Sequence, residues 1–407
     1  MDEPALWAAS GAMALTGRPD GPPLVAPGRP ASAVAAALAR IRAVHPEADL
    51  PDVRVLGERA AAAGLIRRAP TSCGGAFRTT PTYDGVLGLS LPRSSDLALL
   101  PALVEGSVDP EHPWAAVAAW AATRTSAEVE ARVRLLGLPG QVRSAGEQAT
   151  DRVGVLRSPG VARPVPPRPL VIDLSSLWAG PLCAHLLGRC GADVVKVESR
   201  DRPDGARTAP GHFYDLLHAG HRAISVDFGD GAELEVLRDL AARADLVIES
   251  SRPRALARLG LDADALVAAG VSWLSITARG RASDAVGFGD DVAFGAGLHT
   301  PEHWPVGDAL ADPLTGVSAA AAAVELLAGG TSALLDVSMH HVAQEAAAGP
   351  TAPHAVERHR DGWLLVTDSG VHPVPAAYCR PATGRAPAGG SSNASFGLRG
   401  VIPPGHR

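Results

Sequence analysis

Residues 170–198 constrain the fold more than any other stretch of the chain. They begin with an apolar run at 170–174, pass through a turn of small residues at 175–181, and continue as a helical stretch that stops at Gly191. A second run, rich in β-branched residues, follows at 193–198. This succession of strand, turn, helix and strand predicts a βαβ unit. Such units build parallel sheets, in which ligands bind beyond the C-terminal ends of the strands.

The next part of the chain keeps the same alternation. Strands are expected at 223–228, 244–250 and 271–277, and helices at 231–243 and 315–327. One or two short helices are expected within 256–269, and residues 335–339 lead into a final helix. Strands that alternate with helices predict an α/β protein with a doubly wound, Rossmann-like parallel sheet. Residues 278–314 form a long loop region, and long loops inside compact domains are often functional.

Composition divides the chain into four parts. Residues 157–169 are dense in proline, which predicts a stiff, extended linker. Residues 1–156 before it are mainly helical with a strand near 83–91, which predicts a smaller α+β domain. Its expected helices span 5–14, 31–44, 52–68, 95–105, 113–122 and 126–136, the last with a cap signal at Thr125 and Glu128. Residues 170–345 hold the Rossmann-like part, and residues 346–407, rich in Pro, Gly and Ser, predict an abbreviated and partly disordered tail.

Charge and composition exclude several classes of function. The net charge of the 407 residues is -6 and no long basic block occurs, so nucleic acid is not an expected partner. The apolar stretches are short and interrupted, so no membrane span is expected. The four cysteines form no CxxC and the N-terminus is acidic, which favours reduced thiols and a cytoplasmic protein. No His, Cys and Asp cluster has the spacing of metal ligands, so no metal is expected.

Two segments of the chain echo one another at a constant distance. Gly297 lies about 286 residues after Gly11, and the same offset relates the Ala-rich run at 318–324 to the run at 32–38. A weaker echo relates Asp361-Gly362 to Asp84-Gly85. Echoes that keep their order predict an internal duplication.

Residues 170–345 resemble the family III CoA-transferases, the CaiB/BaiF group that includes formyl-CoA transferase and α-methylacyl-CoA racemase. The resemblance rests on motifs at 173–175, 179–181, 191–198, 204–207, 244–253, 258–261, 311–316 and 336–339. Residues 1–150 resemble the later part of the same family. The chain therefore resembles two partial copies in tandem, the back of one copy joined to the front of a second.

The resemblance implies transfer of CoA between carboxylic acids through a covalent aspartyl intermediate, with acyl-CoA as donor and a carboxylic acid as acceptor. The position that matches the family's nucleophile is Asp312. On its own residues Asp312 also fits an N-cap, because Asp is common just before a helix. A helix N-terminus stabilises an anion as well. In the first copy the offset of about 286 residues places Ala26 at the position that corresponds to Asp312, so that copy lacks a nucleophile.

The resemblance also implies that CoA lies across the C-terminal ends of the strands. The positions that match the family's CoA contacts are Leu177, Trp178, Ser250, Ser251, Arg258, Thr277 and Ala278. Arg258 suits a phosphate partner or a solvated helix position. Trp178 suits adenine stacking or a plug in the core. The family further implies a homodimer, or pairing with a related CoA-transferase subunit.

Three alternative functions remain open at this point. The unusual tandem layout also suits a catalytically inactive CoA-transferase-like subunit that binds CoA or pairs with a complete partner. An acyl-CoA racemase is disfavoured because the resemblance implies a catalytic His where this chain has Gly289-Asp290-Asp291. An NAD-dependent oxidoreductase is disfavoured because the first turn, 175–181, lacks GxGxxG.

Overall fold

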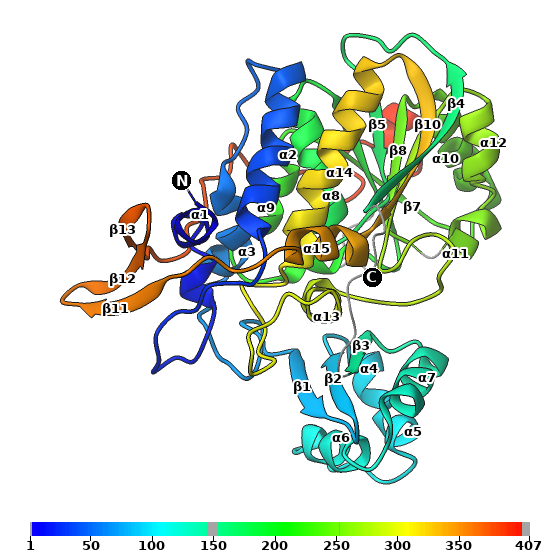
Figure 1. Cartoon of the computed structure of the whole chain (residues 1–407). Helices are drawn as coiled ribbons and strands as arrows, with labels where there is room; N and C mark the ends of the chain where they lie inside the picture. Colours follow the sequence, from blue (N-terminus) through cyan, green and yellow to red (C-terminus); the bar gives the residue numbers. More distant parts are fainter. Residues whose placement is uncertain (1, 145–153, 252, 401–407) are drawn as a thin grey trace.

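A seven-stranded sheet forms the centre of the protein in a computed structural model that describes residues 2–144, 154–251 and 253–400 (Figure 1). Its strands lie in the order β4-β10-β9-β8-β5-β6-β7. They are β4 (Val155–Ala162), β5 (Leu170–Asp173), β6 (Asp193–Ser199), β7 (Arg222–Val226), β8 (Leu246–Glu249), β9 (Ser272–Thr277) and β10 (Thr331–Ser338). Neighbouring strands are parallel except β4, which pairs antiparallel with β10 at one edge.

The strand order confirms the predicted doubly wound fold. Counted along the chain from β5, the six parallel strands lie in the order 3-2-1-4-5-6, which is the Rossmann arrangement. The order reverses between β5 and β8, where the two crossover connections leave in opposite directions. A crevice opens at the C-terminal side of such a switch point, so the fold predicts a ligand site beyond Asp173 and Glu249.

Helices cover both faces of the sheet, because successive strand residues point to opposite sides. Val171 belongs to the core shared with α8 and α14, whereas Ile172 belongs to the core under α10 and α12. The helices of this part are α8 (Ala179–Arg189), α9 (Phe213–His218), α10 (Gly231–Arg243), α11 (Pro253–Arg258), α12 (Ala263–Ala268), α13 (Gly289–Gly295), α14 (Ala311–Ala328) and α15 (Met339–Ala347).

The long helix α14 is the central helix of the molecule (Figure 1). A Cβ on Gly316 would lie 2.7 Å from the carbonyl oxygen of Ala179, so α8 and α14 meet backbone to backbone. By length and composition alone α14 could cross a membrane, but 72% of that stretch is buried inside the protein. Its apolar sequence is accounted for by its place in the core.

The N-terminal part of the chain packs against this core and then forms a separate small unit. Its helix α2 (Pro30–Val44) lies beside α14, with an ion pair between Arg40 and Glu325. The small unit is a three-stranded antiparallel sheet with helices, an α+β unit as expected, but it covers 77–144 and not the whole of 1–156, because the preceding residues pack against the large core. It consists of β1 (Phe77–Pro81), β2 (Gly85–Ser90), α4 (Ser94–Ala98), α5 (Leu100–Val104), α6 (Pro113–Ala121), α7 (Ser126–Leu136) and β3 (Gly140–Ser144). Thr125 and Glu128 form the predicted cap of α7.

Two predicted helices of the N-terminal part are too long. The helix expected at 5–14 is α1 (Glu3–Ala9), which ends because Gly11 has a φ of +77° where it approaches Ala377. The stretch at 52–68 forms only η2 (Val53–Gly57) and α3 (Glu58–Ala62), and Gly64 follows with a φ of +64°. Short 3₁₀ turns also occur as η1 (Met13–Leu15) and η3 (Gly205–Thr208).

Two segments are more ordered than expected. Residues 157–162 of the predicted linker belong to β4, because their backbone pairs with β10. The tail forms an antiparallel sheet of β11 (Ala355–His359), β12 (Gly362–Thr367) and β13 (Gly370–Pro373), followed by η4 (Asn393–Phe396). The buried Asn393 side chain accepts from the backbone of Ser225 and donates to it, which fixes the tail to the edge strand β7. Residues 401–407 of the predicted tail lie outside the described residues.

The secondary structure repeats at the offset found in the sequence. Helix α13 begins 286 residues after α1, and α14 overlaps the position of α2 at the same offset. The hairpin of β11 and β12 resembles that of β1 and β2, both antiparallel. An internal duplication stays a prediction, and these pairs of elements are what it would produce.

Candidate functional site

Asp312 lies in the first turn of α14, at the second residue of the helix. The N-cap position is Leu310, so the interpretation of Asp312 as an N-cap is wrong. Its carboxylate accepts a hydrogen bond from the backbone N–H of Gly289 at the start of α13. At this position the carboxylate lies near the positive end of the α14 helix dipole, and Asp312 lines a cavity.

Gly289 holds the carboxylate in place by close approach. A Cβ at this position would lie 2.4 Å from Oδ2 of Asp312 and 2.2 Å from the carbonyl oxygen of Ala309. Contacts this short do not occur with real side chains, so only glycine allows α13 and the start of α14 to meet here.

We expect Gly289→Ala to impair the site more than the fold. The added methyl group must displace either Asp312 or the Ala309 backbone, so the attack on an acyl-CoA that the sequence predicts for Asp312 should slow by at least about tenfold. Labelling of Asp312 by acyl-CoA and thermal unfolding check this together. A variant that labels Asp312 at the wild-type rate would contradict the argument from close approach. Gly231→Ala, at a position with no atom near the new Cβ, is the matched control.

Three carboxylates and one arginine set the electrostatics of the site. Burial raises the pKa of Asp312 to about 7, against the opposing effect of Arg59 and with the support of Asp290 and Asp308. Burial likewise raises the pKa of Asp290 to about 6, again with Asp308 adding to the shift and Arg59 opposing it. Asp290 accepts from the backbone N–H of Ala309 at 2.9 Å, so it belongs to the same cluster and is not a surface loop acid.

Arg59 reaches this cluster from α3, more than two hundred residues away in the chain. Its guanidinium contacts both oxygens of Asp308, at 2.9 and 2.5 Å, and lies 5.4 Å from the ring centroid of Trp178. The N-terminal part therefore contributes to the site within one chain, because Arg59 and Asp312 line one cavity.

Two cavities meet at Asp312. The first, the strand-end cleft, has a volume of about 440 Å³ and lies beyond the C-terminal ends of β5, β8 and β9, lined among others by Ser176, Ser250, Thr277 and Asp312. The second, the aromatic pocket, has a volume of about 420 Å³ and is lined among others by Trp178, Phe213, Phe288, Arg59 and Asp312. Leu177, Phe288 and Asp312 line both cavities, so Asp312 lies where one space opens into the other.

The structure brings together most of the residues expected to contact CoA. Leu177, Ser250, Ser251, Thr277 and Ala278 line the strand-end cleft with Asp312. Trp178 instead lines the aromatic pocket, buried with its ring edge against Phe213 at 5.4 Å, which is the plug arrangement. Arg258 is exposed on α11 and lines neither cavity. These assignments as CoA contacts stay predictions.

Sequence reasoning missed Arg93 and Arg202, which line the strand-end cleft. Arg93 also reaches Asp96 and lies over the ring of Phe288. Arg202 follows β6 on the loop before Asp204 and is exposed. No signal in the sequence distinguished either residue from the many other surface arginines.

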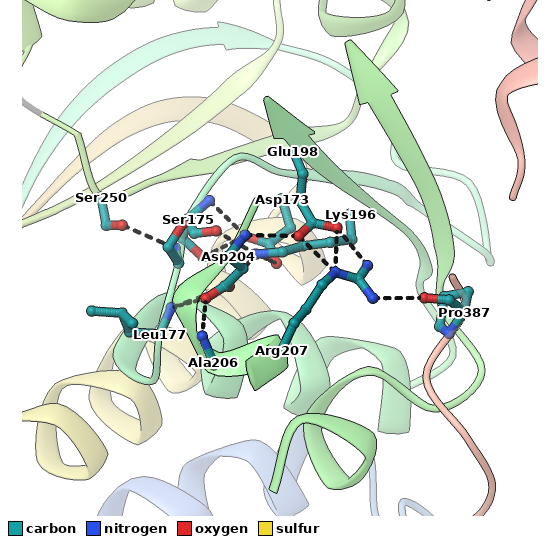
Figure 2. A network of polar contacts seen from close by, with 11 residues as sticks. Asp173, Ser175, Leu177, Lys196, Glu198, Asp204, Ala206, Arg207, Ser250 and Pro387 are labelled. Atoms are coloured by element: carbon teal, nitrogen blue, oxygen red, sulfur yellow. Dashed lines mark hydrogen bonds and ion pairs between the residues drawn. The ribbon is translucent and has the colours of Figure 1, made fainter. Parts of the chain in front are cut away.

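A buried ionic network holds the loop that separates the two cavities (Figure 2). Asp204 accepts from the backbone N–H of Leu177 at 3.1 Å, and Ser250 contacts the N–H of Ser176. Leu177 has a φ of +71°, a left-handed conformation that costs a non-glycine residue of order 1 kcal/mol. Its side chain is 41% exposed, and the Asp204 carboxylate keeps it at the junction of the cavities.

Lys196 supplies the positive charge that balances the carboxylates of Asp173 and Asp204 in this network. Its ammonium lies 3.2 Å from Asp204 and 3.5 Å from Asp173, and it donates to the carbonyl oxygen of Ser175. Burial alone would lower the pKa of Lys196, but the two carboxylates raise it, so the group stays charged. Glu198 pairs with Arg207 beside it. All other cations among the side chains are arginine or histidine, since Lys196 is the only lysine of the sequence.

Comparison with known proteins agrees with this geometry. The model of CoA-transferase family III matches residues 170–362, from β5 to the start of β12. Over these residues, a little under half of the chain, the protein is similar to CoA-transferase family III. The matched segment contains β5 to β10, Asp312 and the lining of the strand-end cleft except Arg93, whereas Arg59 also lies outside it.

Curated relatives cover shorter parts of the chain. A succinyl-CoA:mesaconate CoA-transferase of Haloarcula hispanica is 38% identical over 90 residues, 20% of this chain and 23% of the relative. A succinyl-CoA–D-citramalate CoA-transferase of Chloroflexus aurantiacus is 26% identical over 201 residues, 43% of this chain and 50% of the relative. The chain thus spans no more than half the length of these relatives. Among solved structures, a hypothetical protein of Mycobacterium tuberculosis matches at 27% identity with a TM-score of 0.44, over 51% of this chain and 66% of that one.

Proposed function

We propose that the protein transfers CoA from an acyl-CoA to a carboxylic acid, with Asp312 as the covalent nucleophile. The observation that carries the proposal is the position of Asp312 at the junction of the two cavities. A thioester bound there would have its CoA part in the strand-end cleft and its acyl part in the aromatic pocket, with the carbonyl carbon beside Asp312. The similarity of residues 170–362 to CoA-transferase family III supports the same reaction class.

The first half of the reaction splits the donor thioester. A carboxylate oxygen of Asp312 attacks the thioester carbonyl carbon, the C–S bond breaks, and CoA leaves as a thiolate with the electron pair. The product is a mixed anhydride between Asp312 and the acyl group. The thiolate then attacks the aspartyl carbonyl carbon, which releases the donor carboxylate and leaves Asp312 as its CoA thioester.

The second half repeats these steps in reverse with the acceptor. The acceptor carboxylate attacks the aspartyl thioester and expels the CoA thiolate, and the thiolate attacks the acceptor's acyl carbon. The new acyl-CoA leaves and Asp312 returns as a carboxylate, so no proton or outside reactant is consumed. The N–H of Gly289 and the positive end of the α14 helix dipole would stabilise the negative charge on oxygen at each stage.

Trapping experiments test the proposal. Purified protein is incubated with acetyl-, butyryl-, phenylacetyl- and succinyl-CoA, treated with hydroxylamine or borohydride, and mapped by intact and peptide mass spectrometry. We expect a modification at Asp312 that is lost in Asp312→Ala. Binding of CoA without an adduct from any donor would overturn the transferase and favour the inactive CoA-binding subunit. A cytoplasmic location and a homodimer, both expected from the sequence, stay proposals.

The pH dependence of adduct formation should follow the ionisation of Asp312. The nucleophile is the carboxylate, and the pKa of Asp312 is raised to about 7. The rate of adduct formation should therefore rise about tenfold from pH 6 to pH 8 and level off above this range. Single-turnover labelling at a series of pH values measures the profile. A rate already constant from pH 5 upwards would show that Asp312 titrates like an ordinary surface carboxyl group.

A further inference from the structure

The aromatic pocket differs in character from the strand-end cleft. Its wall holds the side chains of Trp178, Phe213 and Phe288, together with smaller apolar residues: Ala63, Leu65, Ala76, Pro92, Ala206 and Pro210. Trp178 and Phe213 are buried and meet edge to face. A wall of this composition binds hydrocarbon by the burial of apolar surface and offers aromatic faces for stacking.

The pocket has no cation to spare for a second carboxylate. Arg59 is the only lysine or arginine among the described residues that line it. Its guanidinium is bound by both oxygens of Asp308, and Asp290 and Asp312 lie close enough to act on its charge. The cluster therefore holds three carboxyl groups against one guanidinium, so an added carboxylate would meet repulsion instead of a partner.

The other polar groups of the pocket are also engaged. The Ser90 hydroxyl donates to Asp291 at 2.8 Å, and Ser72 contacts Asp290 and the backbone N–H of Phe77. A dicarboxylate placed here would lose its hydration without equivalent hydrogen bonds.

From these observations we infer that the protein acts on apolar monocarboxylic acids, aromatic or branched, and excludes dicarboxylates from the aromatic pocket. This inference rests on the proposed function, because it assigns the acyl group of the transferred thioester to this pocket. It separates the protein from those curated relatives whose names specify succinyl-CoA. The acyl groups of donor and acceptor would both have to bind in the aromatic pocket, since each forms its anhydride at Asp312.

A matched pair of donors tests the inference on the wild-type protein. Butyryl-CoA and succinyl-CoA both carry four-carbon acyl groups and differ in a terminal methyl against a carboxylate. We expect butyryl-CoA and phenylacetyl-CoA to label Asp312 at least about tenfold faster than succinyl-CoA. Equal or faster labelling by succinyl-CoA would overturn the inference and leave the proposed transferase intact. No labelling by any donor would defeat the proposed function, and the inference with it.

A charge introduced into the pocket gives an independent test. Ala63 is half-buried in the wall, so Ala63→Arg adds a cation without removing a large apolar side chain. The ratio of succinyl- to butyryl-CoA labelling should rise about tenfold in this variant. Ala63→Gln, similar in reach and neutral, should leave the ratio as in the wild type. An unchanged ratio in a folded Ala63→Arg protein would show that the acyl group lies elsewhere.

Discussion

Asp312→Asn should lower the rate of CoA transfer by at least about 10³-fold, because the amide cannot attack the thioester. The substitution keeps the size of the side chain and the contact with Gly289, so binding of CoA should change little. Initial rates and isothermal titration with CoA separate the two effects. A loss of both binding and transfer would indicate a disturbed site instead of a missing nucleophile.

The same variant should be more stable than the wild type at alkaline pH. The pKa of Asp312 is about 7 in the folded protein and near its ordinary value of 3.8 in the unfolded chain. The folded state therefore holds the proton more tightly, and its stability falls as the pH rises from about 4 to 7. Asparagine cannot ionise, so we expect a gain of about 4 kcal/mol at pH 8, three pKa units at about 1.4 kcal/mol each, that disappears at pH 4.

Thermal unfolding of both proteins at the two pH values measures this gain. Asp20→Asn, on an exposed loop, removes one negative charge away from the site and serves as the control for net charge. Replacing a reactive, destabilising carboxylate by an amide should raise the stability at pH 8, whereas replacing a structural carboxylate should lower it. If Asp312→Asn is less stable than the wild type at pH 8, the carboxylate stabilises the start of α14 and the nucleophile assignment loses its support.

Local sequence signals predicted the large sheet because its strands are short, buried and separated by regular helices. The run at 170–174 is β5, and the turn after it leads into α8 as expected. The same pattern places the strand ends side by side, so the cleft residues Ser250 and Thr277 could be named before the structure was known. In a parallel sheet the C-terminal ends of all strands lie at one edge, so residues that follow the strands in the sequence are expected to lie together. This is why the residues of the strand-end cleft could be predicted.

The contribution of Arg59 and Asp308 to the site could not be predicted from the sequence, because it depends on contacts between distant segments. Nothing near Arg59 distinguishes it from other helix arginines, and its partner Asp308 lies 249 residues away. The N-cap interpretation of Asp312 failed for a local reason, since the helix begins one residue before it. The helix predicted at 52–68 is longer than the observed elements, because the alanines of this stretch favour a helix. The turn at Gly64 ends it early.

Lys196 shows how a buried charge can be required by geometry. The chain uses arginine at nearly every cationic position, yet a lysine stands at this one. An ammonium is compact, and here it donates to the Ser175 carbonyl and lies 3.2 Å from Asp204 and 3.5 Å from Asp173. The planar fork of a guanidinium needs more room and approaches carboxylates side by side.

Lys196→Met should therefore destabilise the fold by about 3–5 kcal/mol, because it leaves Asp173 and Asp204 buried without a cation. Burial already raises the pKa of Asp173 and Lys196 opposes that rise, so protonation should reduce the loss at low pH. Lys196→Arg should also destabilise, although it keeps the charge. Urea unfolding at pH 5 and 8 measures all three proteins, and Lys196→Met with Asp204→Asn should recover part of the loss. An arginine variant as stable as the wild type would refute the argument from the compact ammonium, since charge alone would then suffice to hold the Leu177 loop.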